Sequence, residues 1–195
     1  MGNRAVLVLE NKYIPAKESI YQPAIYLHWN GGRDSVEGFL AVARMARIRS
    51  DDYGMARMCQ IIGNFFQGTL SVGCGMYKYL DTNNFDNGVY LINKDYRIVG
   101  RKHYSGAEQN EYTLNEMVHA VLLRNTWVID EIRDACANLK NYDLPEDYVN
   151  YLNWLHATDL DELEHYSEEY ANFDYPEWID KCEFTPRPRK GENYA

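Results

Sequence analysis

The spacing nearest to a known catalytic motif occurs in two Glu-x-x-His pairs, Glu116 with His119 and Glu162 with His165. On helices this spacing is half of a di-iron carboxylate site, which needs two such pairs and two further glutamates facing one bundle core. Here both pairs are expected to lie off the main apolar face of their helices, and the first half of the chain has the pattern of strands. We therefore expect chance spacing on polar faces, with no metal and no cofactor.

Nucleophilic catalysis is the second chemistry to weigh, at Cys74 with His103 as the available base. A cysteine nucleophile needs a nearby base and a lowered pKa, and the local sequence guarantees neither. Because free cysteines are usually buried, a cysteine at a strand end is the favoured interpretation. An enzyme with a scattered site around Cys74 and His103 stays open as an alternative.

The remaining motifs exclude several classes of protein. Cysteines occur only at positions 59, 74, 136 and 182, without a C-x-x-C pair, so neither a disulfide framework nor a structural zinc site is expected. Neither phosphate-binding glycine motif is present. Five arginines of the front half are interleaved with acids, which predicts a neutralised surface rather than a basic patch: Arg33, Arg44, Arg47, Arg49 and Arg57.

Negative charge is concentrated between residues 141 and 183. Thirteen carboxylates there are opposed by Lys181 alone, which gives −12, whereas the whole chain carries −9 and the rest therefore sums to +3. The same stretch holds six Tyr, two Trp and one Phe. Disordered acidic tails are poor in aromatic residues, so this composition predicts a folded surface that meets something basic.

A helical wheel of residues 160–173 separates these side chains by type. Leu163, Tyr166, Tyr170 and Phe173 share one sector, and the carboxylates fall on the opposite side. Asp161, Glu164 and Glu168 are then ~4.5 and ~6 Å apart along the axis, which is close to the spacing of phosphates on a nucleic-acid strand. In the preceding helix a tryptophan beside acids is suited to an interface hot spot. The predicted partner-binding residues are Asp147, Trp154, Asp161, Glu164, Glu168 and Glu169.

The alternative is that this acidic face is merely solvated, as on any amphipathic surface helix. Like charges at this density cost a few tenths of a kcal/mol per i,i+4 pair, which favours a functional use.

The elements that must position these residues predict an α+β fold. In front we expect a small mixed or antiparallel sheet with two helices. The expected strands are 5–9, 24–29 and a strand-like 68–75, followed by a hairpin of 88–92 and 96–99. The expected helices run from Asp34, with Glu37 as its capping partner, to Ile48, and from Asp51 or Asp52 to Phe66.

The back half is predicted to be helical. A Thr113-x-x-Glu116 capping box opens a helix to Leu139 with a bend near Thr126, and further helices follow over 145–157 and 159–173. This gives an α+β core over 1–110, a helical acidic region packed on it over 111–183, and a basic, proline-containing, disordered tail over 184–195. No apolar run approaches the ~18 residues of a membrane span, and the first ten residues lack a signal-peptide core. A cytoplasmic protein without a membrane partner is expected.

The string from Tyr26 to Gly32, YLHWNGG, resembles sequences of small proteins from phages and other mobile elements. In general character the chain resembles anti-defence proteins such as anti-CRISPR and anti-restriction inhibitors, many of them small, acidic and non-enzymatic. That resemblance implies an inhibitor in the host cytoplasm that occludes the basic surface of a nucleic-acid-binding defence complex by nucleic-acid mimicry. The implied partner is CRISPR–Cas or restriction machinery, with no direct nucleic-acid binding. A structural or assembly subunit, whose acidic face neutralises a neighbouring chain, is the further alternative.

Overall fold

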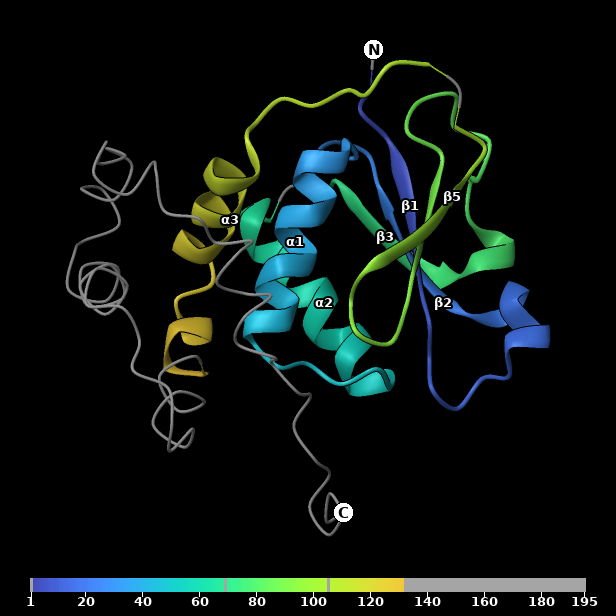
Figure 1. Cartoon of the computed structure of the whole chain (residues 1–195), viewed down its shortest axis with the longest axis horizontal. Helices are drawn as coiled ribbons and strands as arrows, with labels where there is room; N and C mark the ends of the chain where they lie inside the picture. Colours follow the sequence, from blue (N-terminus) through green and yellow to red (C-terminus); the bar gives the residue numbers. More distant parts are fainter. Residues whose placement is uncertain (1, 69, 105, 132–195) are drawn as a thin grey trace, which may run out of the picture.

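The computed structural model describes residues 2–68, 70–104 and 106–131. These residues form a five-stranded mixed sheet and three α-helices, an α+β architecture as the sequence predicts (Figure 1). The strands are β1 (Ala5–Leu9), β2 (Pro23–Leu27), β3 (Val72–Met76), β4 (Val89–Ile92) and β5 (Ile98–Lys102). The helices are α1 (Arg33–Met45), α2 (Asp52–Phe65) and α3 (Leu114–Leu123), and residues 127–131 are helical as well.

The order of strands in the sheet is β3-β2-β1-β4-β5. The central pair, β1 and β4, is parallel, and the other three pairs are antiparallel. All five residues of β1 are buried. A strand covered on both faces is apolar throughout, which explains the continuous run AVLVL.

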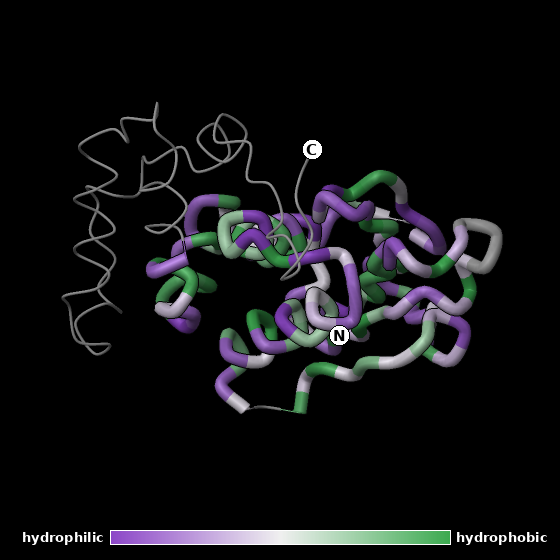
Figure 2. The backbone as a smooth tube through the Cα atoms, turned by 90° about the horizontal axis from the view of Figure 1, so that it is seen from below, coloured by the Kyte–Doolittle hydropathy of each residue, from purple (hydrophilic) through white to green (hydrophobic). Residues whose placement is uncertain are grey.

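The alternation of side chains divides the core into two clusters. Leu7, Ile25 and Leu27 pack with the helices on one face, whereas Val6, Val8 and Ala24 face the other side. Figure 1 shows the three α-helices on one side of the sheet and two short 3-10 helices, Ala16–Tyr21 and Tyr77–Tyr79, on the other. In Figure 2 the helices alternate between hydrophilic and hydrophobic residues along their turns, as amphipathic helices do.

Capping residues set two of the helix starts as predicted. Asp51 caps α2 by accepting the Gly54 N–H at 3.1 Å, and Thr113 and Glu116 form the capping box of α3. The predicted cap of α1 is wrong. Gly32 is the N-cap, and the Asp34 carboxylate instead accepts the backbone N–H groups of Glu111 and Tyr112 at 2.8 and 2.7 Å.

The break predicted near Thr126 is confirmed, and Asn125 explains it. Its buried side-chain amide donates to the carbonyls of Val121 and Ile61 at 2.9 and 3.0 Å. The backbone resumes helical geometry from Trp127. The helices predicted beyond residue 131 lie outside the described residues. Within the part of the chain described, no helix is both long and apolar enough to cross a membrane.

Candidate functional site

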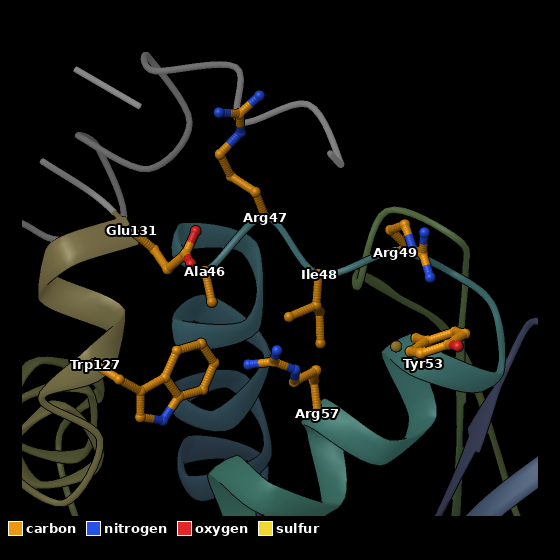
Figure 3. Close-up of a pocket in the computed structure, with 9 residues that line it drawn as sticks. Ala46, Arg47, Ile48, Arg49, Tyr53, Arg57, Trp127 and Glu131 are labelled. Atoms are coloured by element: carbon orange, nitrogen blue, oxygen red, sulfur yellow. The ribbon is translucent and has the colours of Figure 1, made fainter. Parts of the chain in front are cut away.

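All six residues predicted to bind a partner lie outside the described residues: Asp147, Trp154, Asp161, Glu164, Glu168 and Glu169. The described residues contain a different candidate. A cavity of about 210 Å³ lies where the end of α1, the start of α2 and the helical residues 127–131 meet. Its charged and aromatic lining consists of Arg47, Arg49, Arg57, Tyr53, Trp127 and Glu131. We call this cavity the arginine pocket (Figure 3).

Arg47 is placed by the way α1 ends. The Arg47 N–H donates to the Arg44 carbonyl at 2.8 Å, and the Ile48 N–H donates to the Ala43 carbonyl at 3.3 Å. This is the Schellman pattern, which puts the residue after the C-cap in the left-handed region. Arg47 adopts φ = 51° there, a position where glycine is usual. Figure 3 shows its side chain extending outward from the turn.

Arg49 is held by a buried carboxylate. Its Nε lies 3.2 Å from a carboxylate oxygen of Asp51, whose side chain is fully buried. The guanidinium also lies over the ring of Tyr53, 4.8 Å from the centroid. Asp51 therefore has two roles, because it caps α2 and fixes Arg49 at the same time.

Arg57 comes from the second turn of α2 and is exposed. Its guanidinium lies 5.2 Å from the ring centroid of Trp127, and Figure 3 shows the two side chains directed toward each other. Cation–π contacts of this kind leave guanidinium N–H groups at the edge free to bind a ligand.

Gly54 allows the segment before α2 to approach the helix. A Cβ atom at this position would overlap the backbone carbonyl of Arg49, which also accepts a hydrogen bond from the Tyr96 hydroxyl at 2.8 Å. The close approach brings Arg49 over the first turn of α2 and so forms one wall of the pocket.

Three guanidinium groups and one carboxylate line the arginine pocket, so it has an excess of positive charge. Arginine binds carboxylate and phosphate groups through paired N–H donors, which suits the pocket to an anion. Pockets for drug-sized ligands usually measure about 300–1,000 Å³. A cavity of about 210 Å³ is smaller, and it fits one anionic group rather than a large ligand.

The expectation of a neutralised arginine surface is only partly confirmed. Arg33 pairs with Glu37 at 3.7 Å and Arg49 pairs with Asp51. Arg44 donates to the Tyr96 carbonyl instead. Arg47, Arg49 and Arg57 nevertheless share one cavity, because Arg33 and Glu37 lie at the far end of α1 and Asp34 is occupied elsewhere. The interleaved charges gave no indication in the sequence that these three arginines share a cavity, because their clustering depends on where α1 ends.

The candidate pair Cys74 and His103 is separated by the sheet. Cys74 lies in edge strand β3, and His103 directly follows the opposite edge strand β5. Four inter-strand spacings of ~4.8 Å place them roughly 19 Å apart, too far for proton transfer between them. These two residues therefore do not form one nucleophile–base pair, and the alternative of an enzyme with a scattered site stays a prediction.

The first Glu-x-x-His pair has a structural role. The Glu116 carboxylate accepts the Thr113 N–H at 2.7 Å as part of the capping box. His119 was expected on a polar face, but it is only 4% exposed, and burial lowers its pKa to about 4. Among the described residues no group of three or more His, Cys, Asp or Glu is arranged to hold a metal. Glu162 and His165 lie outside those residues.

The distinctive string from Tyr26 to Gly32 forms the end of β2 and the turn into α1. Asn30 adopts φ = 53°, and a Cβ at Gly31 would collide with Ala5, so this turn packs against β1. Trp29 is 44% exposed and is not a core residue. Its role as an anchor for a partner stays a prediction.

The sequence matches no protein family model, and neither curated proteins nor solved structures show significant similarity to it.

Proposed function

We propose that this chain is a non-enzymatic binding protein with two oppositely charged surfaces that engage a complex of protein and nucleic acid. The observation that carries this proposal is the segregation of charge. Three arginines gather in one pocket, whereas thirteen carboxylates opposed by one lysine fall within residues 141–183. A nucleoprotein complex offers both counterparts, namely phosphates and the Lys and Arg side chains that hold them.

The acidic region supplies the first contact. Carboxylates that the sequence predicts at phosphate-like spacing engage Lys and Arg side chains that otherwise hold nucleic acid, and Trp154 adds apolar contact. The mechanism is occlusion, in which the acidic region competes with nucleic acid for the basic surface of the partner. The resemblance to anti-defence proteins favours CRISPR–Cas or restriction machinery as the target class.

The arginine pocket supplies the second contact. In contrast to the expectation of no direct nucleic-acid binding, it binds a single phosphate of the nucleic acid that the complex already carries. Its small volume suits one phosphate, and paired guanidinium N–H groups match phosphate geometry. The acidic region opposes wider nucleic-acid binding, so this contact orients the protein and adds little affinity for free nucleic acid.

Capture from bacterial lysate tests the proposal. Tagged full-length protein is used at low and high salt, with and without nuclease. We expect it to retain a nucleoprotein complex at low salt and to release it at high salt, because exposed charge contacts are screened. Reversing Asp161, Glu164 and Glu168 to Lys should abolish capture. Arg57→Ala should reduce capture only while nucleic acid is present.

Matched controls separate site-specific effects from changes in net charge. Reversing the exposed residues Glu10, Asp81 and Asp95 to Lys changes the net charge equally, and Arg33→Ala removes an arginine at the other end of α1. Both controls should capture the complex normally. Equal capture by the acidic triple variant and wild type, with both folded, rejects the proposal. Self-association without any bound complex supports an assembly subunit instead.

A further inference from the structure

Two cysteines that are fifteen positions apart meet across the face of the sheet that the helices cover. The register pairs Cys74 of β3 with Ile25 of β2. Directly opposite residues of an antiparallel pair point to the same face, and Ile25 packs in the helix-side core. Cys74 is therefore on the helix side of the sheet. Cys59, on α2, packs against the same core.

The two thiols are neighbours, close enough for a side-chain hydrogen bond between them. They differ in access, because Cys74 is exposed at the edge of the sheet while Cys59 is partly buried beneath α2. An oxidant therefore reaches Cys74 first. Burial raises the pKa of Cys59 to about 11, which keeps this thiol protonated and disfavours its direct oxidation by peroxide.

We propose that Cys59 and Cys74 form an oxidisable thiol pair that a peroxide converts into an intramolecular disulfide. In the first step the Cys74 sulfur attacks the peroxide. An S–O bond forms, the O–O bond breaks, and one water leaves a sulfenic acid behind. In the second step the Cys59 sulfur attacks the Cys74 sulfur, so that an S–S bond forms, the S–O bond breaks and a second water leaves. Peroxide accepts two electrons in total, and both thiol protons end in water.

The disulfide cross-links edge strand β3 to α2. Among the described residues, β3 pairs only with β2. Because β3 carries no charged residue, its other edge lacks the charges that usually block pairing with further strands. Cross-linking fixes this strand to the helix that covers it. Oxidation thus changes how firmly one edge of the sheet is held.

The sequence offers a direct readout of this reaction. Trypsin cuts after Arg57 and Lys78 and nowhere between them, so both cysteines fall in one peptide, Met58–Lys78. The folded full-length protein is treated with one equivalent of hydrogen peroxide, alkylated under denaturing conditions and digested without reductant. We expect this peptide to lose both alkylation sites and to regain them after reduction. Chymotryptic cleavage after Phe65 or Phe66 should then give two peptides joined by the disulfide.

Two variants assign the order of events. In Cys59→Ser the sulfenic acid at Cys74 should persist and be trapped by dimedone, because the resolving thiol is gone. In Cys74→Ser the thiol of Cys59 should stay open to alkylation, because its burial protects it from peroxide. Methionine oxidation adds mass to the same peptide and does not block alkylation, so it is distinguishable.

The wild-type experiment alone can overturn the proposal, whether or not the variants fold. The proposal would be contradicted if the Met58–Lys78 peptide still carried two alkylatable thiols after peroxide treatment. A Cys74 sulfenic acid that persists in the wild type after the peroxide is consumed, or a disulfide that links two chains, would contradict it equally.

Discussion

At the scale of single residues, Arg47 lines the pocket although its backbone conformation is unfavourable for a residue other than glycine. A non-glycine residue in the left-handed region costs about 1–2 kcal/mol relative to the right-handed region. Arg47 adopts that region with φ = 51° and lines the arginine pocket. Backbone strain of this kind is often found at binding sites, where the surrounding structure maintains it. Gln67 ends α2 in the same conformation, so the left-handed backbone belongs to the helix end, and the functional argument for Arg47 depends on its place in the pocket.

Arg47→Gly separates stability from binding. Glycine removes the left-handed penalty but adds disorder to the unfolded chain, so the free energy of unfolding should rise by about 0.5–1 kcal/mol. Capture of the nucleic acid-containing complex should weaken in the same variant, because one guanidinium is lost. Urea denaturation and lysate capture measure the two effects. A variant that is less stable and captures the complex normally would mean that Arg47 serves the fold alone.

Single residues also show where sequence reasoning stops. Thr113 with Glu116 and the cap at Asp51 were predictable because each acts within three or four positions. Asp34 was not, because its partners are the backbone N–H groups of Glu111 and Tyr112, 77 and 78 positions away. The contact between the thiols of Cys59 and Cys74 could not be predicted for the same reason, because it depends on how β3 pairs with β2.

At the scale of elements, α3 docks closely on α1. A Cβ at Gly38 would collide with the side chain of Met117, so glycine is what lets the two helices approach. His119 of α3 is buried within this layer, and burial lowers its pKa to about 4. The packing of α3 therefore requires a neutral imidazole.

The pKa of His119 predicts a loss of stability on mild acidification. The unfolded chain binds a proton near pH 6.5, whereas the folded chain resists it until about pH 4. The contribution of neutral His119 to the free energy of unfolding is therefore present above about pH 6.5, and it is lost as the pH falls toward 4. Lowering the pH from 7.5 to 5.5 should decrease the free energy of unfolding by about 1.3 kcal/mol through this residue. Denaturation at both values should show that His119→Gln loses less stability than wild type over this interval. If wild type and His119→Gln lost equal stability, the acid sensitivity would arise from residues other than His119.

The elements themselves were more predictable than their arrangement. The hairpin of β4 and β5 follows from the turn at Asn93–Asp95, and the stripe of α2 follows from helical periodicity. The order β3-β2-β1-β4-β5 depends on pairings between distant strands, including the parallel pair β1 and β4. The apolar pattern predicted that α1 ends at Ile48, but the helix ends at Met45. Because of this earlier end, residues of the segment 47–57 can line the pocket.

At the scale of the whole molecule, charge is distributed unevenly. Residues 1–131 contain 14 Lys and Arg and 14 Asp and Glu, so they are neutral overall, whereas residues 141–183 carry −12. Such a separation directs a protein toward partners that carry charge themselves. The arginine pocket gathers three of the positively charged side chains of this otherwise balanced part of the chain. The central claim is that this pocket binds a phosphate.

Calorimetric titration of full-length protein with inorganic phosphate tests that claim most directly. We predict saturable binding at one site that weakens as salt is raised. Arg57→Ala should lower the affinity at least about tenfold, because a charge-assisted contact contributes about 1.5–3 kcal/mol. Arg33→Ala should leave the affinity unchanged. Absence of saturable binding, or equal affinity in wild type and Arg57→Ala, would contradict the account.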